Sequence, residues 1–196
     1  MRRAGLGDTV AGHAGDQCCH VADFVVGEET GGRAWAFGTL PGVPVAQRGH
    51  RPVGVDLSPR MVEQARRKFT AAGFDAAVLM GDASDPPARA GRSFDVILVR
   101  HLLRTLPAPQ GALRRWVSLL RPGGLVLIEG NWDSPADDQS YAADSEALPW
   151  LGGVTAERLL QALRPLVADL HTESLTDPDL WGRPIHDERY AIIARP

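Results

Sequence analysis

A chain of 196 residues is long enough for one domain with its own core, and its 44% hydrophobic and 23% charged residues are close to globular averages, which excludes disordered and fibrous classes. No apolar run approaches the roughly 18 residues that span a bilayer, and no signal-peptide stretch opens the chain, so we expect a cytoplasmic protein with no membrane contact. A formal net charge of −3 gives no electrostatic reason to bind nucleic acid, which leaves a small molecule as the expected partner.

Residues 1–32 show no sustained helical or strand period. We interpret them as an N-terminal segment, a poorly defined or truncated lid, that precedes a domain over residues 33–196. From residue 51 onward, short apolar runs alternate with amphipathic stretches. This alternation is typical of βαβ units on a parallel sheet.

The clearest unit begins with a strand at residues 52–55, which ends in Asp56. Ser58 is predicted to cap a helix that starts at Pro59, where the missing N–H has no helical partner to lose. Apolar residues follow at helical spacing, and Gly73 is expected to end the helix.

The remaining elements are predicted by the same patterns. Strands are expected at residues 76–80, 94–99 and 125–128, helices at 112–120 and 155–166, and a tight turn at 121–124. The polar stretch at residues 131–149 is interpreted as a loop or lid, and residues 168–175 and 188–194 as two final strands. The chain is therefore predicted to be α/β, with a mostly parallel sheet, helices on both faces and an antiparallel C-terminal edge strand.

Four blocks, in this order along the chain, carry a resemblance to a known family: residues 49–61, 81–83, 93–99 and 120–129. The chain resembles the class I S-adenosylmethionine-dependent methyltransferases, especially the bacterial small-molecule and quinone-biosynthesis type, over about residues 33–130. The resemblance implies a Rossmann-like fold and S-adenosylmethionine as cofactor. It also implies methyl transfer to an O, N or C nucleophile of a small molecule.

The resemblance further implies a cofactor site. Asp56 holds the position of the family's acidic residue, whose two oxygens accept hydrogen bonds from both ribose hydroxyls. Asp82 matches the residue near the adenine amino group. Without the resemblance, Asp56 is an ordinary turn residue at a strand end, and Asp82 caps the following turn. The other implied cofactor contacts are Gly38, Leu57, Met61, Gly81, Ala83 and Arg100.

His101 lies where the family lines the methyl-transfer pocket, at a carboxyl strand end. A neutral imidazole there can act as general base if the acceptor is a hydroxyl, and an orienting or structural role is the alternative. Asp95, at the start of a strand, is interpreted as a structural contact and left out of the site. Candidates for the substrate side, or alternatively core residues, are Trp132, Tyr141, Trp150 and Trp181.

The glycine-rich loop of the family is altered in this chain. Gly38 and Gly42 match the outer glycines, but Leu40 replaces the middle glycine and Ala36 the acid. This degenerate loop supports an alternative, a catalytically inactive methyltransferase-like interaction module. A nicotinamide-dependent oxidoreductase shares the strand, acid and helix around Asp56, but the later blocks favour the methyltransferase pattern. The sequence leaves open whether the chain forms a homodimer.

Overall fold

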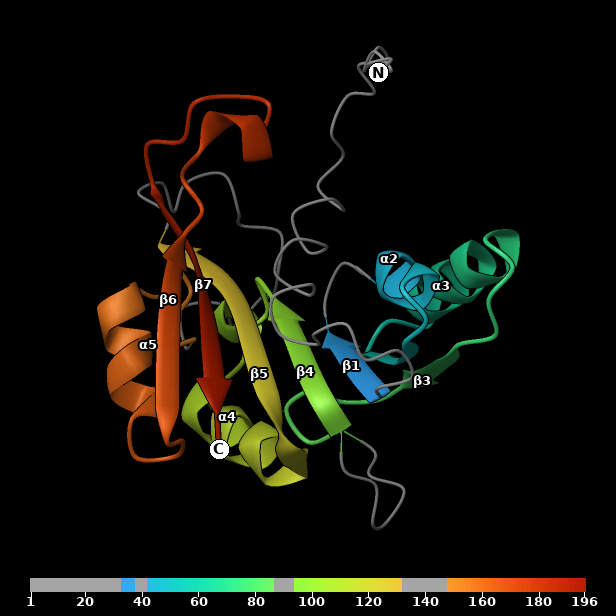
Figure 1. The fold of residues 1–196 in the computed structure, drawn as a ribbon, viewed down its shortest axis with the longest axis horizontal. Helices are drawn as coiled ribbons and strands as arrows, with labels where there is room; N and C mark the ends of the chain where they lie inside the picture. The colour runs from blue at the N-terminus through green and yellow to red at the C-terminus, as the bar shows by residue number, and fades with distance from the viewer. Residues whose placement is uncertain (1–32, 38–41, 87–93, 132–147) are drawn as a thin grey trace, which may run out of the picture.

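The structure, a computed structural model, describes residues 33–37, 42–86, 94–131 and 148–196 (Figure 1). Its strands are β1 (Arg33–Phe37), β2 (Arg51–Asp56), β3 (Ala77–Met80), β4 (Phe94–Arg100), β5 (Leu120–Asn131), β6 (Asp169–Ser174) and β7 (Glu188–Arg195). Its α-helices are α2 (Gly42–Gln47), α3 (Pro59–Ala71), α4 (Pro109–Leu119) and α5 (Ala156–Leu163), and its 3-10 helices include η1 (Leu103–Thr105) and η3 (Pro178–Leu180). The predicted segment 1–32 lies outside the described residues.

The described strands form one seven-stranded sheet in the order β3-β2-β1-β4-β5-β7-β6. The strands from β3 to β5 are mutually parallel, whereas β7 runs antiparallel to β5, and β6 antiparallel to β7. Figure 1 shows this C-terminal pair at one end of the sheet. The mostly parallel sheet with an antiparallel C-terminal edge is therefore confirmed.

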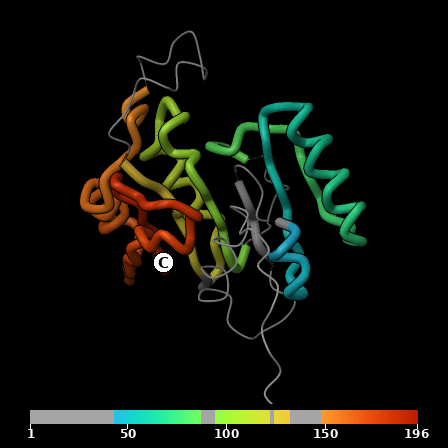
Figure 2. The backbone as a smooth tube through the Cα atoms, turned by 90° about the horizontal axis from the view of Figure 1, so that it is seen from above, coloured from blue at the N-terminus to red at the C-terminus, as the bar shows by residue number. Residues whose placement is uncertain are grey.

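Helices cover both faces of the sheet, as predicted. On one face, α4 and α5 bury Trp116 and Leu159 against β4, β5 and β7 in the largest hydrophobic cluster. On the other face, Val45 of α2 packs with a second cluster that includes Leu98 and Ile128. Helix α3 packs with α2 and β3 in a third cluster. In Figure 2, α3 and α5 lie at opposite ends of the molecule, so the two helix pairs stabilise different parts of the sheet.

The β2–α3 unit forms as its sequence predicts. The Ser58 hydroxyl accepts a hydrogen bond from the Met61 N–H at 3.4 Å, and Pro59 occupies the first helical position. The helix buries a stripe of apolar side chains, and Gly73 follows its end with a φ of 79°, which glycine adopts at little cost. This unit fixes the direction in which the chain leaves Asp56.

Two predictions in the C-terminal half are wrong in detail. The tight turn expected at residues 121–124 is part of β5. There the pairing passes from Phe94–Leu120 to Val96–Gly124, so three residues of β5 lie opposite one of β4. Pro122 has no N–H to donate, so it interrupts the ladder of hydrogen bonds between β4 and β5 in this bulge. The chain does not reverse its direction there. Helix α5 ends at Leu163 rather than residue 166, because Pro165 cannot continue it.

The predicted loop at residues 131–149 falls mostly outside the described residues. At its two ends, Asn131 still belongs to β5, and Leu148 opens a turn before α5. Among the described helices, none is long and apolar enough to cross a membrane.

Candidate functional site at the carboxyl edge of the sheet

The strand order places β1 and β4 side by side at the centre of the sheet. From β1 the chain continues to β2 and β3 on one side, and from β4 it continues to β5 on the other. In open α/β sheets, ligands bind beyond the carboxyl ends of the strands at such a switch point. The predicted site residues that follow described strands all lie at or near this edge: Asp56, Leu57, Met61, Gly81, Asp82, Ala83, Arg100 and His101. Gly38 lies outside the described residues.

Asp56 is the last residue of β2 and is half-buried. Its Oδ1 accepts a hydrogen bond from the Ser58 N–H at 2.8 Å, and its backbone carbonyl accepts one from the Gly81 N–H at 3.0 Å. Within the described residues, no donor bonds to Oδ2. Asp56 is thus both the turn residue that its position predicts and a carboxylate with one oxygen left for a ligand.

Two large apolar side chains beside Asp56 are exposed to solvent. Leu57 is 70% exposed, and Met80, the partner of Asp56 in the β2–β3 register, is 63% exposed. Exposed large apolar side chains at a ligand edge favour contact with a flat apolar ring. The sequence predicts this role for Leu57 and the half-buried Met61 but misses Met80, whose only signal is its position at the end of a strand.

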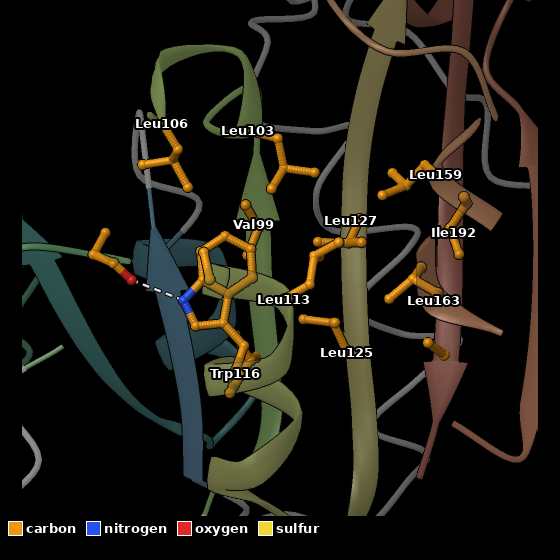
Figure 3. Close-up of a cluster of buried hydrophobic side chains, with 14 of the residues drawn as sticks. Val99, Leu103, Leu106, Leu113, Trp116, Leu125, Leu127, Leu159, Leu163 and Ile192 are labelled. Carbon is orange, nitrogen blue, oxygen red and sulfur yellow. Dashed lines mark hydrogen bonds between the residues drawn. The ribbon is translucent and has the colours of Figure 1, made fainter. Parts of the chain in front are cut away.

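Asp82 and Ala83 follow β3. The exposed Asp82 accepts hydrogen bonds at Oδ1 from the N–H and the hydroxyl of Ser84, at 2.8 and 2.7 Å, which is the turn contact expected from its residue type. The side chain of Ala83 is buried in the core, and its carbonyl accepts the Trp116 indole N–H at 2.7 Å (Figure 3). Trp116 of helix α4 therefore holds the backbone after β3 in place. The N–H of Ala83 is the group of this residue that is left for a ligand contact.

His101 directly follows β4 and has a φ of 51°, the one positive φ of a described residue other than glycine. Its N–H donates to the carbonyl of Ile128 at 2.9 Å. Burial, and after it the guanidinium groups of Arg100, Arg189 and Arg104, lower the pKa of His101 to about 3. The imidazole is therefore neutral at physiological pH, and its conjugate acid is too strong for efficient general-base catalysis.

Glu129 is not among the site residues that the sequence predicts, yet it is the most buried charged residue described at this edge, with 0% of its surface exposed. Its Oε1 accepts the N–H groups of Leu102 and Leu103, at 3.1 and 3.2 Å, and so fixes the segment after His101. Its Oε2 is buried and accepts no hydrogen bond from the described residues. Burial raises the pKa of Glu129, and the opposing effect of these two N–H groups and of Arg104 still leaves it at about 8.

Arg189, near the start of β7, is a second residue that the sequence did not single out. Its side chain is buried and binds the Asp187 carboxylate through Nε at 3.0 Å and a terminal nitrogen at 2.6 Å. The guanidinium carbon lies 5.2 Å from the centre of the Trp181 ring. The only sequence signal for this contact between Asp187, Arg189 and Trp181 is that Asp187 and Arg189 are two residues apart.

The aromatic candidates for the substrate side divide into three groups. Trp132 and Tyr141 lie outside the described residues. Trp150 is 3% exposed and belongs to the largest core cluster, so its interpretation as a core residue is confirmed. Trp181 is half-buried, donates its indole N–H to the Leu175 carbonyl at 2.6 Å, and remains beside Arg189.

Comparisons with known proteins agree with this geometry. A family model described as a methyltransferase domain matches residues 39–128. Aklanonic acid methyltransferase DauC of Streptomyces sp. (strain C5) is 34% identical over 75 residues, which cover 38% of this chain and 34% of the relative. A ubiquinone biosynthesis O-methyltransferase of Xanthomonas axonopodis pv. citri (strain 306) is 28% identical over 99 residues, which cover 50% of this chain and 41% of the relative.

A solved structure shows the same fold. The [4+2]-cyclase SpnF superposes with a TM-score of 0.70 at 19% identity, over 92% of this chain and 80% of that chain. The chain spans 34% and 41% of the lengths of the two curated relatives above.

The strand order, the antiparallel end and the acids at the carboxyl edge define a Rossmann-like α/β protein. Over residues 39–128 the chain is similar to methyltransferase domains, which is the resemblance that its sequence blocks predict.

Proposed function

We propose that the protein transfers the methyl group of S-adenosylmethionine to a nucleophilic oxygen, nitrogen or carbon of a small molecule. The observation that carries this proposal is the environment of Asp56, a carboxylate with one unengaged oxygen between the exposed Leu57 and Met80. A sugar with two neighbouring hydroxyls and a flat base matches this combination of acceptor and apolar surface.

The residues of the β2–β3 side are suited to the nucleoside part of the cofactor. Asp56 would accept the ribose hydroxyls through Oδ2, since Oδ1 is held by Ser58. Asp82 would accept the exocyclic amine of adenine through the oxygen that Ser84 does not use. Leu57, Met61 and Met80 would lie against the ring, with the backbone of Gly81 and Ala83 beside it. Gly38 and Arg100 are proposed contacts of the methionine part.

When bound, S-adenosylmethionine supplies an electrophilic methyl group on a sulfonium, so the chain's own task is to align a nucleophile and exclude water. His101 is proposed to orient the acceptor, because its neutral imidazole can donate and accept hydrogen bonds. Glu129 accepts the N–H groups of Leu102 and Leu103 and thereby fixes the backbone that follows His101.

The acceptor is proposed to be a small molecule, as the names of the two curated relatives suggest for those proteins. We place the enzyme in the cytoplasm, where the cofactor is made, with no nucleic-acid partner, and a homodimer remains compatible with the proposal. The cyclase that shares this fold illustrates why the activity is argued from the site rather than from the fold.

Calorimetric titration with S-adenosylhomocysteine tests the proposal. The wild-type protein should saturate at micromolar ligand. Asp56→Asn, which keeps an oxygen for Ser58 but removes the charge, should weaken binding about 10-fold to 100-fold, because charge-assisted bonds contribute about 1.5–3 kcal/mol. The control Asp75→Asn changes an exposed acid in the turn before β3 and should leave the affinity unchanged.

Silence of the wild-type protein at millimolar ligand would contradict the proposal and support the interaction module. Equal affinities for the wild type and Asp56→Asn would remove Asp56 from the site.

A further inference from the structure

His101 is the residue at which the chain leaves β4, and its backbone has a conformation that side chains other than glycine rarely adopt. Its φ is 51°, in the left-handed region. There the Cβ lies close to a carbonyl oxygen, so a residue with a side chain occupies this region at a cost in free energy. Such residues persist where the surrounding structure holds them, and they concentrate at functional sites. The hydrogen bonds around His101 therefore show which residues set its position.

Three of these hydrogen bonds come from the neighbouring strand β5. The carbonyl of Ile128 accepts the N–H of His101 at 2.9 Å. Oε1 of Glu129 accepts the N–H groups of Leu102 and Leu103, at 3.1 and 3.2 Å. The regular pairing of β4 with β5 ends one residue before His101. Two consecutive residues of β5 thus hold three consecutive N–H groups just beyond the end of this pairing.

The other side of the turn is closed within η1. The carbonyl of Leu102 accepts both the N–H and the hydroxyl of Thr105, at 2.9 and 2.8 Å. The side chain of Leu103 is 0% exposed and packs in the largest core cluster (Figure 3). The segment after His101 is therefore fixed by β5, by its own turn and by the core, so the backbone of His101 has little freedom to relax.

Glu129 is the part of this arrangement that depends on residue type. Any residue at position 128 supplies a carbonyl, whereas a side-chain oxygen that accepts two successive N–H groups requires an acid or an amide. The side chain of Glu129 is 0% exposed, and its Oε2 accepts no hydrogen bond from the described residues. An apolar residue would fill this space without the cost of burying a carboxyl group. The two N–H contacts of Oε1 therefore account for a glutamate here.

We propose that Glu129 is a positioning residue of the methyl-transfer site, which holds His101 in its left-handed conformation at the carboxyl edge of β4. The inference rests on the proposed role of His101 in orienting the acceptor, and it specifies which side chain sets the position of the imidazole. Because none of its surface is exposed, Glu129 acts through the backbone of residues 101–103 rather than by contact with a ligand.

The ionisation of His101 reports where its imidazole lies. Burial, followed by three neighbouring guanidinium groups, lowers the pKa of His101 from 6.5 to about 3, and these groups belong to Arg100, Arg189 and Arg104. Among the described charged groups, Arg104 also acts on Glu129 and lowers the pKa of that carboxyl group. If the turn relaxes, the imidazole moves toward solvent and its pKa returns toward 6.5. A loss of stability elsewhere in the protein does not move the imidazole.

The first test is an NMR titration of the His101 imidazole, assigned by the absence of its signal from His101→Asn. In the wild type the ring should stay neutral between about pH 5 and 7, where an exposed histidine titrates. Glu129→Leu removes the acceptor, so His101 should titrate within this range. Glu129→Gln keeps a carbonyl oxygen for both N–H groups and should restore the wild-type behaviour. A His101 that stays neutral in Glu129→Leu overturns the inference.

Leu125→Ala is the matched control. Leu125 lies on the same strand, is 0% exposed and belongs to the largest core cluster. Its truncation leaves a cavity and lowers stability, as Glu129→Leu does, but keeps the acceptors of all three N–H groups. His101 should therefore stay neutral between about pH 5 and 7 in this variant. A histidine that titrates in Leu125→Ala as it does in Glu129→Leu would reflect general loosening, and it overturns the inference.

A second measurement uses the wild type and decides the outcome if Glu129→Leu does not fold. Ionisation of Glu129 changes the acceptor at Oε1, so the N–H signals of Leu102 and Leu103 should shift together, with a midpoint near the pKa of about 8. The ring signals of His101 should shift with the same midpoint, and Glu129→Gln should abolish all three shifts. Shifts confined to Leu102 and Leu103, or no shift in any of the three residues, overturn the inference.

Neither measurement requires a ligand, so this inference and the proposed function can fail separately. Absence of S-adenosylhomocysteine binding to the wild type refutes the proposed methyl transfer, while the titration still decides whether Glu129 positions His101. If the wild type binds S-adenosylhomocysteine and His101 stays neutral in Glu129→Leu, the positioning role is refuted and the proposed function stands.

Discussion

The two sides of the carboxyl edge differ in burial and charge. On the β2–β3 side, Asp82 is exposed and Asp56 half-buried, beside two exposed apolar side chains. On the β4–β5–β7 side, Glu129 and Arg189 are buried, and His101 and Glu129 have strongly shifted pKa values. One side is open and carries exposed or half-buried carboxylates, and the other is packed and carries guanidinium groups beside the buried Glu129.

This difference separates binding from stability. Side chains on the open side make few contacts beyond their own turns, so substitutions there should change ligand affinity and leave folding almost unchanged. Charged groups on the packed side hold backbone N–H groups and one another, so substitutions there should change stability and its pH dependence. Perturbed pKa values also concentrate at functional sites, which supports placing the reacting groups on the packed side.

Among the substitutions that test this difference between the two sides, Glu129→Leu should change the free energy of unfolding most. This change leaves the N–H groups of Leu102 and Leu103 without their acceptor in a buried site. Each unsatisfied group costs about 1–3 kcal/mol, so the free energy of unfolding should fall by about 3 kcal/mol in urea denaturation at pH 6. Glu129→Gln keeps a carbonyl oxygen at this position and should lose much less. Equal losses in both variants would show that packing, not hydrogen bonding, governs the site.

The same glutamate predicts a pH dependence with a definite sign. Its pKa is about 8 in the folded protein against 4.5 for the free side chain, so between these values the folded state holds a proton that the unfolded state has lost. The contribution of Glu129 to stability is present below pH 4.5 and is lost as the pH rises through 8. His101, with a pKa lowered from 6.5 to about 3, contributes in the opposite direction, and that contribution is lost as the pH falls below 6.5.

Denaturation between pH 7 and 9 isolates the glutamate, because His101 is neutral there in both states. The wild-type free energy of unfolding should fall toward pH 8 and then level off, and Glu129→Gln should remove this fall. A wild-type profile that is flat over the interval would mean that Glu129 is ionised in the folded protein.

The two sides also differ in how far the sequence could predict them. The Asp56 turn, the Ser58 cap and the strand ends at 81–83 depend on neighbouring residues, so local patterns were enough to place them. Arg189 meets the edge only because β7 inserts antiparallel beside β5, and the burial of Glu129 depends on the segment after β4. Such contacts join residues distant in the chain, and no local spacing encodes them. The bulge in β5 was missed for a related reason, since the pairing with β4 overrides the local turn preference of Pro122 and its glycines.

A smaller effect is expected from Met80→Ser on the open side. Met80 is 63% exposed, so the free energy of unfolding should change by no more than about 0.5 kcal/mol. Loss of its apolar contact with the ring should cost about 1 kcal/mol of binding, a roughly fivefold weaker affinity for S-adenosylhomocysteine in calorimetry. Ala77→Ser, at the other end of β3, is the control and should change neither quantity. A marked loss of stability in Met80→Ser would contradict the separation of binding from folding.

The smallest effect is expected at the opposite end of β4, where Asp95 forms an ion pair with Arg121 of β5 at 2.7 Å. Both side chains are partly exposed, and such pairs contribute about 0–1 kcal/mol, so Asp95→Asn should lower the free energy of unfolding by about 0.5 kcal/mol. Arg121→Gln should have the same effect, and the double variant should lose little more than either single variant. Because Asp95 is the second residue of β4 and lies at the opposite end of this strand from Arg100, affinity for S-adenosylhomocysteine should not change. A weaker affinity in Asp95→Asn would show that this end of β4 is coupled to the site, and the carboxyl edge could then no longer be treated as two independent sides.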